Sequence, residues 1–236
     1  MKSDDPFRPA TYEGSGGKSI PYRLFSPPDE TRAPSPLVVH MHGSRGIGTD
    51  NVRHIDGSGR WPGEAARVRS AYICTRPENQ RQFACYVIAP QASEPWIRRA
   101  LDRPTAPILL TAELIQHLKD TLPIDPRRVY VMGHSMGGHG TWEMAVRYPK
   151  VFAAAVPIGG IGNTGLATRI VGLPVWAFHV TGDPVISVDR TRDMIAAVRD
   201  AGGDPRYTEY DGHTHADLLR AYAEPNLLPW MFSQRR

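Results

Sequence analysis

The chain has 236 residues, of which 41% are hydrophobic and 22% are charged, as in an ordinary globular protein. This length can bury one sizeable core, so we expect a single domain over residues 1–236. The net charge of +4 comes with arginines scattered along the chain, which excludes a basic stripe for nucleic acid, and no apolar run is long enough for membrane insertion.

The cysteines and the N-terminal residues are the parts of the sequence that could indicate the cellular compartment. Cys74 and Cys85 form no CxxC pair and predict neither a zinc site nor a disulfide scaffold, although one optional disulfide between them stays open. Residues 1–6 are polar and contain no apolar segment of a secretory signal. The compartment is therefore left open between cytoplasmic and, with a signal peptide absent from this sequence, secreted or periplasmic. The oligomeric state is left open too.

The first predicted elements form an antiparallel hairpin, with extended segments at Pro9–Glu13 and Ser19–Phe25 joined by glycine-rich residues 14–17. After a polar loop, a buried strand is expected over Leu37–Met41. It runs into His42-Gly43-Ser44-Arg45-Gly46. A strand ending in His-Gly and a small residue resembles the first oxyanion loop of an α/β hydrolase, where backbone N–H groups point at one spot. The alternative is a plain glycine turn.

The next stretch, residues 49–83, is irregular, with one helix expected over Pro62–Ser70; long loops of this kind are usually functional. An apolar strand over Cys85–Ala89 follows. Apolar residues at helical spacing predict a helix over Pro104–Leu122. Asp125-Pro126 is expected to close this unit.

The central stretch runs from Val129 to Gly138, four apolar residues followed by Gly-x-Ser-x-Gly around Ser135. A helical pattern then continues to Tyr148. Strand, tight turn and helix are the context of a nucleophile elbow, in which the serine hydroxyl is lifted above the edge of the sheet. Gly133 and Gly137 have no Cβ to clash where strand and helix leave the turn.

The remaining elements alternate in type. Strands are expected over Phe152–Ile158, Pro174–Val180 and Arg206–Tyr210, with a helix over Asp189–Ala201 and a mostly helical stretch over 216–233 that Pro225 breaks. Alternating strands and helices predict an α/β fold, a mostly parallel sheet covered by helices on both faces, with the hairpin added at its N-terminal end. Ligands of such sheets bind at the carboxyl ends of the strands.

A serine nucleophile needs a base, and the base needs a carboxylate that orients it. In this fold the chain order is Ser, Asp or Glu, then His. Asp183 directly follows a predicted strand and is the expected carboxylate. Asp189 is the alternative, although its place before a helix favours an N-terminal cap. His215 is the expected base, and His213, nearer the strand, is the alternative or a substrate contact.

The chain resembles the bacterial feruloyl-esterase-like carboxylesterases, α/β hydrolases related to the prolyl-oligopeptidase catalytic domain. The motifs that carry the resemblance are Gly133–Trp142, His42-Gly43, Pro77–Gln80, Ala89–Gln91 and Ala223–Trp230. It implies an α/β-hydrolase fold. It also implies Ser135 as nucleophile, Asp183 as acid and His215 as base, with the backbone N–H groups of Met136 and Ser44 as the oxyanion hole.

Two departures from the family pattern concern the site. The family usually has His-Gly-x-x-Asp ahead of the acid, where this chain has His179-Val180-Thr181-Gly182-Asp183, with the spacing kept. The oxyanion loop reads Ser44-Arg45 where Ala-Gly is common. Arg45 is therefore a candidate to replace the donor at residue 44 or to contact the substrate.

The spacing of the site bears on the substrate. Asp183 follows Ser135 by 48 positions, which leaves no room for a lid, so we expect an open site for short acyl groups or for esters attached to a polymer. Trp96, Trp142 and Trp61 could offer flat apolar surface there, or pack in the core. His134, which flanks the nucleophile, is a further substrate-binding candidate, as are Arg45 and His213.

These residues predict a carboxylic ester hydrolase that forms an acyl-serine on short-chain or aromatic esters, such as feruloyl or acetyl groups, including polysaccharide-linked ones. No cofactor is expected, and no metal, because the histidines lack a carboxylate or thiolate cluster. The alternatives are a serine peptidase of prolyl-oligopeptidase type, for which this sequence shows no size-selecting propeller, and a binding protein with a decayed hydrolase site. Diene-lactone hydrolysis would favour cysteine at residue 135.

Overall fold

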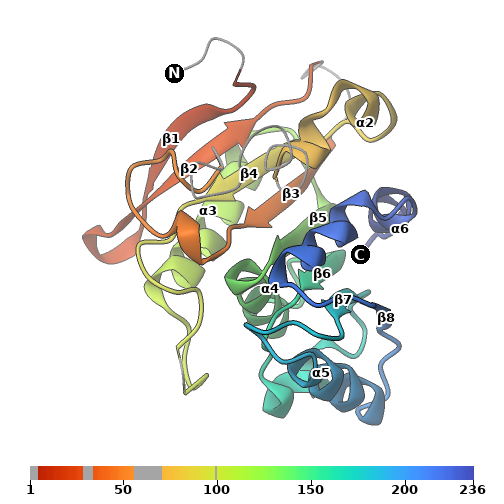
Figure 1. The fold of residues 1–236 in the computed structure, drawn as a ribbon. Coiled ribbons are helices and arrows are strands. Elements are labelled where there is room, and N and C mark those ends of the chain that lie inside the picture. Colours follow the sequence, from red (N-terminus) through yellow and green to blue (C-terminus); the bar gives the residue numbers. More distant parts are fainter. Residues whose placement is uncertain (1–4, 29–33, 56–70, 99) are drawn as a thin grey trace.

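The computed structural model describes residues 5–28, 34–55, 71–98 and 100–236 (Figure 1). Its centre is an eight-stranded sheet in the order β1-β2-β4-β3-β5-β6-β7-β8. The strands are β1 (Arg8–Glu13), β2 (Ser19–Phe25), β3 (Ser35–Met41), β4 (Tyr86–Pro90), β5 (Ile124–His134), β6 (Ala154–Ile158), β7 (Trp176–Val180) and β8 (Arg206–Tyr210).

The strand directions match the expected α/β-hydrolase sheet. β1 and β2 form the antiparallel hairpin, and β2 is also antiparallel to β4. From β4 to β8 every neighbouring pair is parallel. The carboxyl ends of β3, β5, β6, β7 and β8 therefore meet at one edge of the sheet, and loops that leave this edge can place side chains together.

Helices and 3-10 turns connect the strands. The α-helices are α2 (Pro77–Gln82), α3 (Ala106–Thr121), α4 (Met136–Arg147), α5 (Asp189–Asp200) and α6 (Leu227–Ser233). The 3-10 segments are η1 (Ser15–Gly17), η2 (Ser44–Gly46), η3 (Ala71–Thr75), η4 (Thr164–Ile170) and η5 (His215–Ala223).

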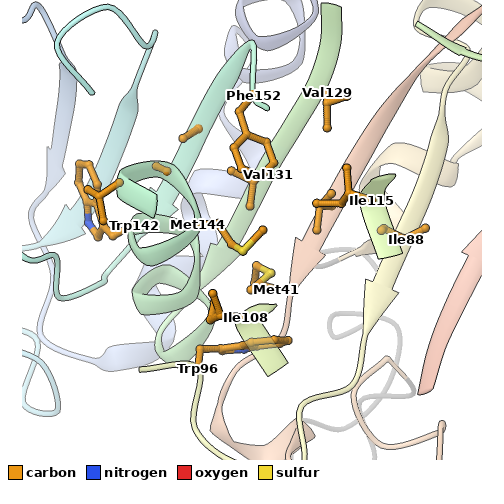
Figure 2. Close-up of a cluster of buried hydrophobic side chains, with 14 of the residues drawn as sticks. Met41, Ile88, Trp96, Ile108, Ile115, Val129, Val131, Trp142, Met144 and Phe152 are labelled. Carbon is orange, nitrogen blue, oxygen red and sulfur yellow. The ribbon is translucent and has the colours of Figure 1, made fainter. Parts of the chain in front are cut away.

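Alternating residues of each central strand face opposite sides, which gives the sheet two cores. Val129 and Val131 of β5 join the cluster that α3, α4 and α5 cover, and Figure 2 shows side chains of this cluster. Tyr130 and Met132 face the other cluster, to which η5 and α6 contribute. The Tyr130 hydroxyl donates to the carbonyl of Gln234 at 2.9 Å, so the segment after α6 lies against β5. Helical cover on both faces buries a sheet of this length.

Several sequence expectations differ from the structure at their boundaries. β5 begins at Ile124, because Ile124 pairs with Ser35 before a register shift, so Asp125-Pro126 lies inside the strand instead of closing the preceding unit. The first part of the helical stretch expected over 216–233 is the 3-10 segment η5, and α6 follows Pro225. The segment expected to be irregular contains η3 and α2, and η4 lies between β6 and β7, where no element was expected. The helix expected over Pro62–Ser70 lies outside the described residues.

Two further findings concern the cysteines and the membrane. Cys74 and Cys85 are both buried and both free, so the optional disulfide is not formed. Among the residues that the structure describes, every helix is too short or too polar to span a bilayer.

Candidate active site

Ser135 sits at the turn between β5 and α4. Its φ of 58° and ψ of −126° are strained for a residue with a side chain. Its N–H donates to the carbonyl of Ile158 on β6 at 2.8 Å, which holds the turn against the neighbouring strand. A Cβ on Gly133 or on Gly137 would come closer than 3.0 Å to the carbonyl oxygen of Met41. The glycines are thus needed for close approach to β3, besides the turn itself.

His215 lies beside this serine. Its Nε2 is 2.7 Å from the Oγ of Ser135, and its Nδ1 is 2.8 Å from Oδ2 of Asp183. His215 is the first residue of η5, directly after the loop that leaves β8. A capping box between Thr214 and Asp217 fixes the start of that segment, with the Thr214 hydroxyl donating to Asp217 at 2.9 Å. The structure therefore brings the three expected residues into one hydrogen-bonded chain.

Asp183 is held in the turn that follows β7. Its Oδ1 accepts the N–H groups of Val185 at 2.8 Å and Ile186 at 3.2 Å, and its carboxylate is fully buried. Burial alone would raise the pKa of Asp183, but the hydrogen bonds from Val185, His215 and Ile186 outweigh it and the pKa is lowered. A carboxylate that stays charged beside Nδ1 keeps the proton on that nitrogen, which leaves Nε2 free to accept one from Ser135.

The alternative carboxylate lies elsewhere. Asp189 is the first residue of α5, is exposed, and accepts from Arg192 at 2.9 Å. The N-cap of α5 is Val188, so Asp189 lies in the first turn and is not the cap that the sequence favoured. Its carboxylate also accepts from the Ser187 hydroxyl at 3.2 Å, and among the described residues it makes no hydrogen bond with either histidine.

The expected oxyanion loop follows β3 and is fixed by His42. The Nε2 of His42 accepts the N–H of Ala92 at 2.9 Å, so its Nδ1 carries the proton and donates to the carbonyl of Gly43 at 2.7 Å. Burial lowers the pKa of His42 to about 4, against a smaller raising effect of the Gly43 hydrogen bond, and the ring stays neutral as this pairing requires. The indole N–H of Trp96 donates to the carbonyl of His42 at 2.9 Å.

The loop and the elbow are in contact. A Cβ on Gly43 would lie 3.3 Å from Nε2 of His134, the residue before Ser135. Ser44 begins η2 and Met136 begins α4. The first N–H groups of a helical turn have no partner within that turn, so both can donate to a ligand.

The substrate-binding candidates fall in different places. Arg45 is exposed in the oxyanion loop, and His213 is exposed on the loop before η5, with its ring over Gly182. His134 is half-buried beneath the oxyanion loop, where its Nδ1 is 3.2 Å from the Tyr222 hydroxyl. Burial and then the charges of His215 and His42 lower the pKa of His134 to about 4.

Trp96 corrects the expectation for the aromatic residues. Its side chain is 0% exposed and packs in the core beside Ile108, as Figure 2 shows, so it cannot offer a face to a substrate. Trp142 is equally buried, and Trp61 lies outside the described residues. The contribution of Trp96 to the site is its hydrogen bond to the oxyanion loop.

The sequence analysis missed the residues that support the loops. His42 was placed in the oxyanion loop, but its hydrogen bond to Ala92 joins positions 50 residues apart and leaves no local pattern. Gln91 belongs to a motif quoted for the resemblance, and its amide donates to the carbonyl of Gly46 at 3.1 Å. Within the described part of the chain, no group of three or more His, Cys, Asp or Glu side chains is arranged to hold a metal ion.

The sheet order, the serine at a strained turn and the converging loops define an α/β hydrolase. The chain belongs to the family described as "Putative esterase", whose model matches residues 17–223. This membership confirms the esterase resemblance, and the sheet confirms the expected fold.

Individual relatives agree with the family. A thermostable esterase of known structure is 33% identical, with a TM-score of 0.86, and the match covers 98% of this chain and 64% of that one. Poly(3-hydroxyalkanoate) depolymerase C of Paucimonas lemoignei is 31% identical over 142 residues, 56% of this chain and 30% of that protein. The bifunctional acetylxylan esterase/xylanase XynS20E of Neocallimastix patriciarum is 21% identical over 166 residues, 70% of this chain and 22% of that protein. The chain thus spans less than a third of either curated relative.

Proposed function

We propose that this chain is a serine carboxylesterase that works through an acyl-serine intermediate on Ser135. The observation that supports this most directly is the 2.7 Å separation between the Ser135 hydroxyl and Nε2 of His215, whose other nitrogen meets Asp183. A separation of this size lets the imidazole take the hydroxyl proton as the oxygen attacks an ester carbonyl.

The chemical steps follow from this arrangement. Ser135 Oγ bonds to the carbonyl carbon while His215 Nε2 takes its proton, and the negative charge collects on the carbonyl oxygen. We assign the N–H groups of Met136 and Ser44 to that oxygen, because both begin helical turns on loops that lie against each other. His215 then gives its proton to the departing alcohol oxygen. Water attacks the acyl-serine with His215 again as base, which releases the acid and restores Ser135.

The substrates we propose are short-chain or aromatic esters, including acetyl or feruloyl groups linked to a polysaccharide. Residues 136–182 are all described and hold only α4, β6, η4 and β7, so no inserted domain covers the serine from this part of the chain. The side chain of His215 is 26% exposed, which leaves the reacting pair accessible to a bulky ester. The polyester depolymerase and the acetylxylan esterase among the relatives agree in kind, since their names describe polymer-linked esters.

The test compares three single variants on p-nitrophenyl acetate and butyrate. Ser135→Ala should abolish turnover with the melting temperature nearly unchanged, and His215→Ala should lose almost as much. His213→Ala is the matched control, two positions away and exposed, and should keep most of the activity. Persistent activity in Ser135→Ala would reject the nucleophile, and a severe loss in His213→Ala alone would reject the base. A panel of methyl ferulate, acetylated xylan, a polyester and a proline-containing peptide then tests the substrate class.

A further inference from the structure

One titratable side chain near the serine has no role in the steps above. His139 lies in the first turn of α4, where its N–H donates to the carbonyl of Ser135 at 3.1 Å. Its Nδ1 accepts the N–H of Ile161 at 2.8 Å, from the loop that leaves β6 at the carboxyl edge of the sheet. The loop that leaves β6 therefore fixes this ring at Nδ1.

The hydrogen bond from Ile161 determines which nitrogen carries the proton. A backbone N–H can only donate, so Nδ1 is the acceptor and the hydrogen of the neutral ring is on Nε2. Burial, followed by the charges of His215 and His179, lowers the pKa of His139 to about 4. The ring is therefore neutral at the pH of a normal assay, and the Nε2–H is a donor of fixed direction.

Nε2 has no hydrogen-bond partner among the residues that the structure describes, whereas Nδ1 has one. It is also absent from the fully buried polar atoms that lack a partner, a set that includes Nδ1 of both His40 and His54. His139 as a whole residue is half-buried. The ring of His139 is thus fixed at Nδ1, leaves its Nε2–H without a partner in the described part of the chain, and lies near enough to His215 to feel its charge.

We propose that His139 is a specificity-determining residue whose Nε2–H donates to an oxygen of the substrate next to the scissile ester. This assignment rests on the proposed function. It favours esters with an ether, hydroxyl or carbonyl oxygen two or three bonds from the ester over their hydrocarbon equivalents. A hydrogen bond between uncharged groups contributes roughly 0.5–1.5 kcal/mol, or about a 2- to 10-fold preference.

Two pairs of esters of equal size test it, one for each side of the ester. On the acyl side, p-nitrophenyl methoxyacetate is compared with p-nitrophenyl butyrate; on the alcohol side, 2-methoxyethyl acetate is compared with butyl acetate. The readout is the ratio of kcat/KM within each pair, variant against unchanged enzyme, so the intrinsic reactivity of each ester cancels.

Three variants distinguish the effect of the Nε2–H group from that of Nδ1. His139→Asn keeps an oxygen that can accept from Ile161 but has no N–H at the position of Nε2. It should lower the ratio about 3- to 10-fold in one pair, while kcat/KM for the hydrocarbon ester of that pair changes little. His139→Gln extends an amide N–H toward the position of Nε2 and should keep the ratio near that of the unchanged enzyme. His139→Phe should lose the preference whether or not the loop shifts.

The outcomes are distinct. Unchanged ratios in both pairs for His139→Asn and His139→Phe would overturn the assignment, as would equal losses on all four esters, which indicate a structural role only. An unchanged enzyme that hydrolyses none of the four esters would remove the proposed function and this inference with it. An active enzyme with unchanged ratios would remove only the role of His139.

Discussion

The exchange Asp183→Asn tests the electrostatic core of the site. In the structure, Oδ1 of Asp183 is fixed by two backbone N–H groups, from Val185 at 2.8 Å and Ile186 at 3.2 Å. The carbonyl oxygen of an asparagine can take that place, so its NH2 group turns to Nδ1 of His215. Nδ1 must then accept, and the ring proton moves to Nε2, where it blocks transfer from Ser135. We expect kcat to fall about 10⁴-fold, roughly 5.5 kcal/mol of barrier.

The assay is initial-rate hydrolysis of p-nitrophenyl acetate at pH 7.5, with the melting temperature measured alongside. The melting temperature should change little, because the asparagine oxygen keeps both backbone hydrogen bonds. Asp189→Asn is the matched control, since Asp189 is exposed and pairs with Arg192 on its own helix. A loss of less than tenfold in Asp183→Asn, or an equal loss in Asp189→Asn, would refute the tautomer argument.

Two further predictions concern stability. Gly137→Ala should lower the free energy of unfolding by about 2 kcal/mol or more in urea unfolding, because its Cβ would collide with the backbone oxygen of Met41; Gly172→Ala, with open space around it, should change it by less than about 0.5 kcal/mol. Equal effects of the two would contradict the close approach. The neutral rings of His42 and His134 have pKa values of about 4 against an ordinary 6.5, so the unfolded chain binds more protons between these values and unfolding becomes easier as the pH falls. From pH 7.5 to 5.0 the free energy of unfolding should drop by roughly 2 kcal/mol per ring, and a constant value would contradict their burial in neutral form.

The parts of the fold that the sequence could predict are those with local patterns. The apolar residues of β5 followed by Gly-x-Ser-x-Gly specify strand, turn and helix within about 20 positions, and the predicted strands and long helices are present. The order Ser135, Asp183, His215 followed from the strands that precede each residue. All three residues follow strands that end at the same edge of a parallel sheet. Once the strands are assigned, it is therefore nearly determined that the three side chains meet.

What escaped prediction depends on contacts between distant positions. For Trp96 the sequence left a place in the site and a place in the core both open, and only its complete burial in the core cluster decides between them. The hydrogen bond from Ala92 to His42 and the one from Ile161 to His139 each join two different loops. They can be predicted only when the positions of both loops are known. The 3-10 form of η5 was missed because its apolar spacing resembles that of an α-helix.

The placement of His215 has a consequence for how the enzyme fails under stress. The base follows β8, which is the last strand of the sheet, pairs on one side only, and has no fully buried residue. Ser135 instead follows β5, which has partners on both sides. Fraying of the outer strand would cost far less free energy than melting the centre. Mild heat or denaturant would then inactivate the protein before it unfolds globally, because His215 moves away while Ser135 keeps its position. This loss would be reversible.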